Sequence, residues 1–315
     1  MVESPNQAKI SVGIDISTIG STAVVIDGSN AIAATRSVSR TGDGNTVEEV
    51  AALIAGLRSD GHSFVRVGIA VPGLVDRETG RVAFSANLPG NTEVDLVRDV
   101  EAATGTSVIL ENDANAGAYG EFSLGAGRGS RNIFYVTLGE GVGGAFIFDR
   151  QIWRGESGFA GEFGYVSINS AGMRLEEVAS SANIIRRTRS RFHQDNTSSL
   201  NKLTEESITL EDIITAAQRD DDFAQMMLGR TGRYVGTAVA GVINLLNIEK
   251  IVVGGEIMTA KHLVLDAIVD RARELSFAPA FQSTSIVEGE LEGNAAAIGA
   301  AVLSRNGEFG NNEYS

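Results

Sequence analysis

The sequence predicts an α/β fold that consists of two similar halves, and three observations support this prediction. Short apolar runs typical of buried strands alternate with segments of helical periodicity, a pattern that favours sheets with a parallel component. A strand–turn–strand pattern that ends in Asp occurs at 12–27 and again at 135–149, which an internal duplication explains most simply. A length of 315 residues, with 43% hydrophobic residues, allows two medium-sized domains.

The first half is expected to begin with a meander of three strands, whose first turn, at 17–21, is rich in hydroxyl groups. The sequence Thr46-Val47-Glu48-Glu49 has the form of a capping box and predicts a helix that is capped by Thr46. The predicted strands are 10–16, 22–27, 31–35, 65–71 and 108–110, with a short hairpin within 75–84 and helices at 46–58 and 94–103.

The second half is expected to combine similar strands with longer helices. One helix should start near residue 175 and run on through 187, and the next should be capped by Thr209 and Asp212. Residues 189–206 are polar and are predicted to be a mobile excursion in which His193 is exposed. The other predicted elements are strands at 135–138, 145–149, 250–255 and 284–287, one or two long helices over 223–246, and helices at 260–275 and 294–303.

The duplication also predicts where the two lobes divide. We expect one lobe to comprise residues 8–115 together with 294–306, and the other to comprise residues 116–293. Residues 307–315 are expected to form a disordered tail, as terminal segments often do.

The composition excludes several classes of function. Because there is no cysteine, disulfides and thiolate zinc sites are excluded, and His62, His193 and His262 are too scattered to suggest another metal site. A net charge of −14 argues against a nucleic-acid or anionic-membrane partner, and it means that a bound nucleotide would need Mg²⁺. The polar amino terminus, and the lack of an apolar run near the roughly 20 residues of a membrane span, predict a cytoplasmic protein.

The stretch Glu111-Asn112-Asp113-Ala114-Asn115 follows an apolar run that suits a buried strand. Asn112 and Asp113 should therefore lie at the carboxyl end of that strand, where open α/β sheets present side chains to ligands. A carboxylate there, beside an amide, could take a proton from an alcohol that attacks a phosphate. The alternative is that Asp113 or Asn115 only caps the following helix, and the five residues alone favour neither interpretation.

Three glycine-containing stretches are candidate ligand-binding loops. The turn at 139–144 could direct backbone N–H groups at a phosphate, although the Glu140 carboxylate would repel that phosphate without Mg²⁺. The alternative is a tight hairpin whose glycines are needed for positive φ angles. The loop at 155–165 carries acidic and aromatic groups suited to sugar hydroxyls, or is a solvated surface loop. Gly254-Gly255 ends an apolar strand where adenine could approach the backbone, or forms an ordinary turn.

Taken together, these motifs resemble those of the ROK family, named for repressors, open reading frames and kinases. The motifs that carry the resemblance are at 70–73, 87–90, 111–115, 138–144, 161–165 and 251–255. The resemblance covers roughly residues 10–304 and implies a duplicated actin/hexokinase-like (ribonuclease H-like) two-lobe fold. It further implies that a sugar binds in the interlobe cleft, that ATP with Mg²⁺ binds at the phosphate turns and the glycine pair, and that the protein is a homodimer.

The resemblance also implies roles for individual residues. Asp113 would be the general base on the sugar hydroxyl, and Asp15 would help to hold the magnesium ion. The residues implied to bind the sugar are Asn87, Asn112, Glu162, Tyr165 and Glu176. The other residues implied to bind the nucleotide are Thr18, Gly139, Gly141, Gly143, Gly254 and Gly255.

Some positions depart from the family's usual sequence. The first phosphate turn usually runs Asp-Ile-Gly-Gly-Thr-Lys, whereas here it runs Asp-Ile-Ser-Thr-Ile-Gly at 15–20. Glu140 stands where family kinases usually carry threonine. Tyr165 replaces the usual histidine, and the cysteine loop expected between Asn169 and Leu175 is missing, so no zinc site is expected. The residues implied to bind the sugar therefore match the family's usual sequence better than those implied to bind the nucleotide.

These observations lead to one predicted function and two alternatives. We expect a sugar-binding protein that is an ATP- and Mg²⁺-dependent kinase of a hexose or N-acetylhexosamine. The first alternative is a catalytically silent sugar sensor that resembles the ROK regulators. Direct DNA binding is not expected, because the first strand begins at Ile10 and leaves no room for a winged helix. The second alternative is a dimerisation module that binds no sugar.

Overall fold

The computed structural model describes residues 10–40, 45–76, 79–85, 88, 90, 92 and 94–306. By their contacts, these residues divide into two compact units. The first unit contains the described residues up to 128, together with 151–160 and those from 294 onward, and the second unit contains 129–150 and 161–293. This division places residues 116–128 and 151–160 with the first unit, whereas the prediction assigned them to the second lobe. The predicted tail at 307–315 lies outside the described residues.

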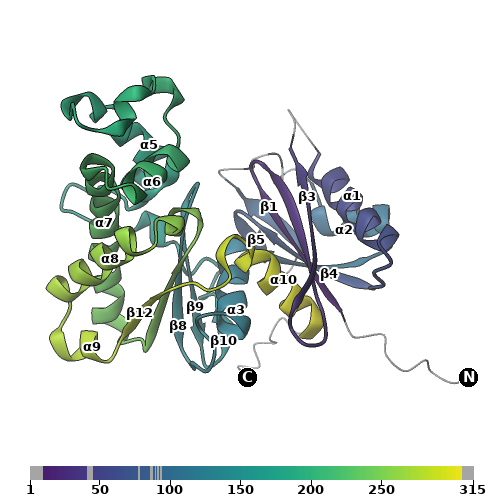
Figure 1. Ribbon diagram of the computed structural model, residues 1–315. Coiled ribbons are helices and arrows are strands. Elements are labelled where there is room, and N and C mark those ends of the chain that lie inside the picture. Colours follow the sequence, from purple (N-terminus) through teal and green to yellow (C-terminus); the bar gives the residue numbers. More distant parts are fainter. Residues whose placement is uncertain are drawn as a thin grey trace, which may run out of the picture. The chain divides into compact units, whose positions relative to one another are not determined.

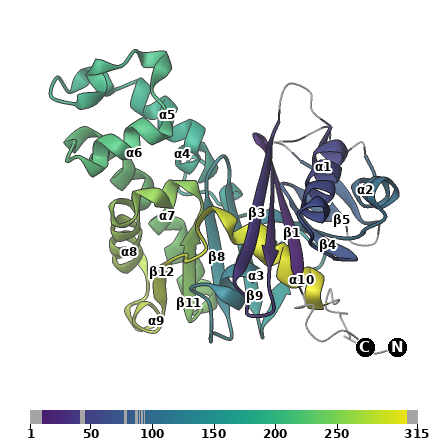
Figure 2. The same cartoon turned by 45° about the vertical axis from the view of Figure 1, so that its right-hand side comes forward.

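The first unit is built on a five-stranded sheet of order β3-β2-β1-β4-β7. Strands β1, β2 and β3 form an antiparallel meander, and β4 and β7 are parallel to β1, so the predicted mixed α/β sheet is confirmed. Helices α1 and α2 cover one face, and α10 lies on the other face with α3 packed against it (Figures 1 and 2). The elements are β1 (Ser11–Ser17), β2 (Gly20–Ile26), β3 (Ile32–Ser39), α1 (Thr46–Ser59), β4 (Arg66–Val71), β5 (Leu74–Asp76), β6 (Arg81–Phe84), α2 (Leu96–Thr104), β7 (Ser107–Asn112), α3 (Asp113–Leu124) and α10 (Ala295–Asn306).

Helix α1 begins where it was predicted, but its cap is a different residue. The side-chain oxygen of Asn45 accepts a hydrogen bond from the backbone N–H of Val47, so Asn45 is the N-cap and Thr46 is the first residue of the helix. The predicted capping box at Thr46 is therefore wrong. Glu49, which would complete that box, instead binds Arg40 and Ser21.

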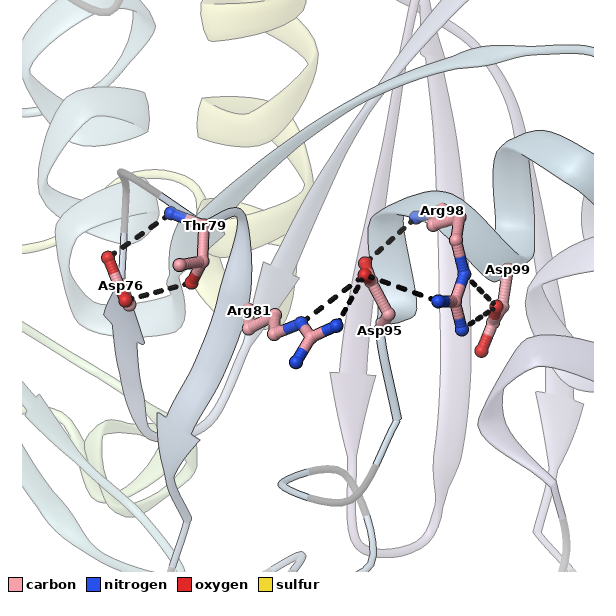
Figure 3. A network of polar contacts seen from close by, with 6 residues as sticks. All are labelled: Asp76, Thr79, Arg81, Asp95, Arg98 and Asp99. Atoms are coloured by element: carbon pink, nitrogen blue, oxygen red, sulfur yellow. Dashed lines mark hydrogen bonds and ion pairs between the residues drawn. The ribbon is translucent and has the colours of Figure 1, made fainter.

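Helix α2 is connected to the small β5–β6 hairpin by a surface network of charged groups (Figure 3). Asp95 caps α2 by accepting from the backbone N–H of Arg98, and the same carboxylate accepts from Arg81 on β6. Arg98 in turn pairs with Asp99. The hydrogen bond from Arg81, followed by that from the Arg98 backbone, lowers the pKa of Asp95 below its ordinary value.

Helix α10 touches its neighbours backbone to backbone. A Cβ atom added at Gly299 would lie 1.7 Å from the carbonyl oxygen of Ala116 in α3, and one added at Gly13 in β1 would lie 1.8 Å from the carbonyl oxygen of Ala297. Gly68 in β4 makes an equally close approach to α10. Glycine at these positions thus allows one helix to fix β1, β4 and α3 relative to one another.

The second unit repeats the arrangement of the first. Its sheet has the order β10-β9-β8-β11-β12, in which β8 and β9 form an antiparallel hairpin and β8, β11 and β12 are parallel. The elements are β8 (Ile133–Leu138), β9 (Val142–Phe148), β10 (Gln151–Trp153), α4 (Glu176–Ala179), α5 (Ser181–Arg189), α6 (Leu210–Gln218), α7 (Asp222–Leu246), β11 (Lys250–Gly254), α8 (His262–Leu275), α9 (Ala278–Gln282) and β12 (Ser285–Glu288). Strand β10 pairs with β9 in this sheet, but by its contacts it belongs to the first unit.

Two predictions for this unit are corrected by the structure. The helix expected to run from about 175 through 187 is interrupted at Ser180, whose extended backbone (ψ 157°) separates α4 from α5. The segment predicted as a mobile excursion forms three short 3₁₀ helices, Phe192–Gln194, Ser199–Lys202 and Glu205–Ser207, and the first two carry the buried side chains of Phe192 and Leu200. The predicted exposure of His193 and the predicted capping box of Thr209 and Asp212 are both confirmed. Among the described residues, no helix is long and apolar enough to cross a bilayer.

Replacing Gly299 by Ala should destabilise the protein, because the new methyl group would collide with the backbone of α3. We expect a loss of about 1–3 kcal/mol in the free energy of unfolding, measured by urea denaturation. Gly241→Ala in α7 is the matched control, because Gly241 is exposed and has open space around it. That variant should gain up to about 1 kcal/mol from helix propensity alone. Equal stabilisation of both variants would contradict the close packing of α10.

Candidate functional site

The junction of β7 and α3 places Asn112 and Asp113 at the carboxyl end of a parallel strand, beside the end of β4. Asn112 is the N-cap of α3, because its Oδ1 accepts from the backbone N–H of Asn115 at 3.0 Å. Its Nδ2 donates to the carbonyl oxygen of Gly73 at 2.9 Å and to Oδ1 of Asp113 at 3.0 Å. The alternative that Asp113 or Asn115 caps the helix is therefore wrong, and Asn112 orients the Asp113 carboxylate.

Asp113 is half-buried at the first position of α3. Besides the contact from Asn112, its Oδ1 accepts from the backbone N–H of Ala114 at 2.9 Å. These two contacts hold the same oxygen, so they define how the carboxylate is turned. A carboxylate fixed in this way at the end of a sheet has the position required of a general base.

Asp15 lies near the end of β1, in register with Ala70 of β4. Burial and, to a smaller extent, the negative charge of Asp113 together raise the pKa of Asp15 to about 8. The structure thus brings together two carboxylates that the sequence separates widely. At neutral pH Asp15 holds a proton, and a cation bound beside the pair would favour its release.

The two carboxylates suit Mg²⁺, which prefers oxygen ligands. Within the described part of the chain, no group of three or more His, Asp or Glu residues could hold a metal ion. Mg²⁺ often binds through one or two carboxylates together with water and the phosphates of a nucleotide, so a pair of carboxylates is sufficient.

Glu111 is a residue of this site that the sequence analysis did not single out. Its carboxylate is buried and forms an ion pair with Arg154, while its other oxygen accepts from Asn115 Nδ2 and from the backbone N–H of Asn112, each at 3.1 Å. Glu111 therefore holds the backbone of Asn112 and the first turn of α3 in place. An acidic residue in an apolar strand signals a buried partner, but that partner lies 43 residues further along the chain.

The β8–β9 turn in the second unit is a tight hairpin, as the alternative interpretation predicted, but positive φ angles are not the reason for its glycines. The N–H of Gly139 donates to the carbonyl oxygen of Gly141 at 3.0 Å, and neither these glycines nor Gly143 has a positive φ. Glu140 is exposed at the tip. The Gly139 N–H is thus bonded within the turn, and the Gly139 carbonyl oxygen accepts from the N–H of Ser181 at 2.8 Å, so a role of this turn in binding phosphate stays a prediction.

The glycine pair after β11 has a structural requirement of its own. Gly255 has a φ of +95°, and a Cβ atom there would lie 2.3 Å from the carbonyl oxygen of Leu138. Gly254 lies close to the hydroxyl group of Tyr135. The adjacent carboxylate of Glu256 accepts from the hydroxyl of Ser181, at the start of α5. The ordinary-turn interpretation thus accounts for Gly255, and a role in binding adenine stays a prediction.

Glu162 and Glu176 lie near each other in the second unit. Partial burial of the Glu162 carboxyl group and the charge of Glu176 raise the pKa of Glu162, although the residue as a whole is exposed. Glu176 accepts from the backbone N–H of Val142 at 3.0 Å. Tyr165 is 55% exposed, and the guanidinium of Arg174 lies 4.3 Å from the centre of its ring. Asn87, the remaining predicted sugar ligand, lies outside the described residues.

Two sheets of matching topology, with carboxylates near the ends of β1 and β7 in the first unit, define a duplicated α/β protein of the actin/hexokinase-like class. The chain belongs to the ROK family: the model of that family matches residues 11–306. The chain is 35% identical to a glucokinase of Thermotoga maritima over 256 residues, which cover 78% of this chain and 80% of that protein.

Solved structures show similarity of the same kind. The chain is similar to a ROK family glucokinase from Streptomyces griseus in complex with glucose and AMPPNP, with a TM-score of 0.85, 29% identity, and coverage of 95% of this chain and 100% of that chain. It is also similar to a ROK family transcriptional regulator that is a homologue of the E. coli MLC protein. That structure gives a TM-score of 0.83 at 26% identity, and the match covers 96% of this chain and 79% of that chain.

The raised pKa of Asp15 predicts a pH-dependent stability. The fold favours the neutral form of Asp15, so this contribution is complete below the ordinary pKa of 3.8 and is lost as the pH rises to about 8. The free energy of unfolding should fall by about 1.4 kcal/mol for each pH unit within this window. Asp15→Asn should remove that fall when thermal unfolding is followed from pH 5 to pH 8.5 without Mg²⁺.

A matched control for this experiment is Asp27→Asn. The hydroxyl of Ser29 lowers the pKa of Asp27, so this carboxylate contributes stability above its ordinary pKa and loses it only in acid. The Asp27→Asn protein should keep the wild-type slope between pH 5 and pH 8.5. An unchanged slope in Asp15→Asn would show that Asp15 is ionised throughout.

Proposed function

We propose that this protein is an ATP- and Mg²⁺-dependent kinase that transfers a phosphoryl group to a hydroxyl group of a hexose or N-acetylhexosamine. The observation that carries the proposal is the Asp113 carboxylate, which Asn112 orients at the end of β7 and which has Asp15 near it. The similarity to the Thermotoga glucokinase, and to the Streptomyces glucokinase in complex with glucose and AMPPNP, supports this choice of reaction.

In the proposed reaction Asp113 accepts the proton of the sugar hydroxyl as the hydroxyl oxygen attacks the γ-phosphorus of ATP, and the bond from that phosphorus to the β,γ-bridging oxygen breaks so that ADP leaves. The side-chain amide of Asn112 and the backbone N–H of Ala114 hold the orientation of the Asp113 carboxylate during this transfer. Asp15 would help to hold Mg²⁺, which neutralises charge on the phosphates when it is bound. The buried Glu111–Arg154 pair fixes the strand end from which both Asn112 and Asp113 project.

On the sugar side, we propose that Glu162 and Glu176 accept hydrogen bonds from sugar hydroxyls and that the exposed ring of Tyr165 contacts the sugar. Asn87 belongs to the same proposal through the family resemblance. Asn112, the other predicted sugar ligand, also contacts the protein itself. Its oxygen caps α3 and its amide donates to Gly73 and Asp113, so we propose that it orients the base as well.

On the nucleotide side, we propose that Thr18 in the β1–β2 turn contacts a phosphate. The remaining contacts are assigned to backbone groups of the second unit, at Gly139, Gly141, Gly143, Gly254 and Gly255. A homodimeric assembly, which rests on the family resemblance, and a cytoplasmic location, which rests on the polar amino terminus and the lack of a long apolar run, complete the proposal.

A second candidate function is that of a sugar sensor that does not phosphorylate its ligand. The changed phosphate turns, with Ser17 in the first and the exposed Glu140 in the second, favour this candidate. The similarity to a ROK transcriptional regulator supports it as well. The two candidates differ in one respect: the kinase must bind Mg-ATP, whereas the sensor need not.

The proposal is tested by thermal-shift screening of a sugar panel with and without Mg-ATP, followed by an ADP-release assay on the sugars that bind. Asp113→Asn should lower kcat by about 10²- to 10⁴-fold, because the base is lost, while the Kd for the sugar stays within a few-fold of the wild type. Thr209→Ala, which removes the cap of α6 in the other unit, is the control and should leave kcat unchanged. Sugar binding with no response to Mg-ATP would favour the sensor and reject the kinase.

A further inference from the structure

The β1–β2 turn of the first unit raises the question of what holds its shape. Strand β1 ends at Ser17 and β2 begins at Gly20, so Thr18 and Ile19 form a two-residue turn that contains no glycine at either loop position. We propose that Arg40 is a positioning residue that holds this turn in the conformation needed for a nucleotide phosphate. The inference rests on the proposed kinase function and deepens its nucleotide side.

Arg40 contacts the backbone of the turn at two points. Its side-chain Nη1 donates to the carbonyl oxygen of Ser17 at 2.9 Å, and its backbone N–H donates to the carbonyl oxygen of Ile19 at 2.8 Å. In a trans peptide the N–H of the next residue points opposite to the carbonyl group. By holding these two carbonyl groups, Arg40 therefore sets the directions of the N–H groups of Thr18 and Gly20.

The guanidinium group of Arg40 is itself fixed by the Glu49 carboxylate, which a second residue holds in turn. Its Nε and Nη2 donate to the two carboxylate oxygens of Glu49 in the first turn of α1, each at 2.8 Å. Ser21 of β2 donates to the same carboxylate at 2.9 Å. The side chains of Arg40 and Glu49 are only 9% and 8% exposed, so the pair is a buried, bidentate ion pair.

This arrangement distinguishes a positioning residue from a phosphate ligand. The charge of Arg40 is neutralised by Glu49, and the side chain is almost completely enclosed, so it is not presented to a ligand. Its effect on a nucleotide must pass through the turn. Catalytic rates and affinities are sensitive to small displacements of such backbone groups, which can change them by up to about a hundredfold.

The test needs a variant that does not leave a charge buried without its partner. Removing Arg40 alone would leave the buried Glu49 carboxylate without its cationic partner and could unfold the protein. The informative variant is therefore the double substitution Arg40→Met with Glu49→Gln. Arg58→Met is the matched control. Arg58 also donates to a backbone carbonyl group of the first unit, that of Thr104, but it lies away from the turn.

We expect the folded double variant, checked by circular dichroism, to raise the KM for Mg-ATP by about 10- to 100-fold. The KM for the sugar should stay within twofold of the wild type, and Arg58→Met should change neither constant. Arg40→Lys, which keeps the charge of the pair but loses the bidentate geometry, should give an intermediate KM for Mg-ATP. A folded double variant with an unchanged KM for Mg-ATP would overturn the role of Arg40 while the kinase proposal stands.

Direct binding separates this failure from a failure of the proposed function. Calorimetric titration of the wild type with Mg-AMPPNP should show binding, and the double variant should show a weaker Kd. A wild type that binds Mg-AMPPNP but does not turn over still tests Arg40 through this Kd. A wild type that does not bind Mg-AMPPNP would reject the kinase proposal, and the role of Arg40 would fall with it.

Discussion

Direct backbone contact between helix α10 and three other elements of the first unit is the constraint on which the candidate site depends. Gly13, Gly68 and Gly299 allow α10 to touch β1, β4 and α3 without an intervening layer of side chains. Strand β1 carries Asp15 and helix α3 begins at Asp113, so one helix fixes both elements that bear the carboxylates. Because close-packed backbones leave little room for movement, packing holds the two carboxyl groups near each other.

The buried position of Asp15 beside Asp113 makes ionisation of Asp15 unfavourable. Burial and the charge of Asp113 raise the pKa of Asp15 to about 8, which means that the fold opposes ionisation of both groups. Carboxyl groups with raised pKa values such as this one are frequent at functional sites. An environment that opposes their ionisation in the free protein favours the binding of a cation beside them. The stability that offsets this cost comes from the apolar core and from α10, not from the site itself.

The sequence predicted most elements of the fold because buried strands and amphipathic helices have their own local patterns. The apolar run before Glu111 predicted β7, and the capping residues at Thr209 predicted the start of α6. Local pattern could not choose between Asn45 and Thr46 as the cap of α1, because both residue types suit that position and the choice depends on the partners of Glu49. The interruption of α4–α5 at Ser180 had no signal from proline or glycine.

For the site, the sequence could predict which residues lie at strand ends but not which of them meet. Asn112 and Asp113 followed from their place after an apolar strand, whereas the closeness of Asp15 and Asp113 depends on the order β1-β4-β7 in the sheet. The ion pair of Glu111 and Arg154 joins residues 43 positions apart. Pairings of this kind are decided by tertiary structure, and a single sequence contains no periodicity that encodes them.

Two of the segments that depart from the family's usual sequence, the first phosphate turn and the segment after Glu162, are held by similar structural means. In the first turn, the guanidinium of Arg40 binds the carbonyl oxygen of Ser17. In the segment after Glu162, the guanidinium of Arg174 lies over the ring of Tyr165, and Asn169 accepts from two backbone N–H groups. Side chains of the protein itself thus hold both segments in place. A segment held in this way is ordered before its ligand arrives, so binding does not have to order it. Whether such a segment can bind a phosphate or a sugar then depends on the directions of its backbone and side-chain polar groups. The number of glycines in the motif does not predict these directions.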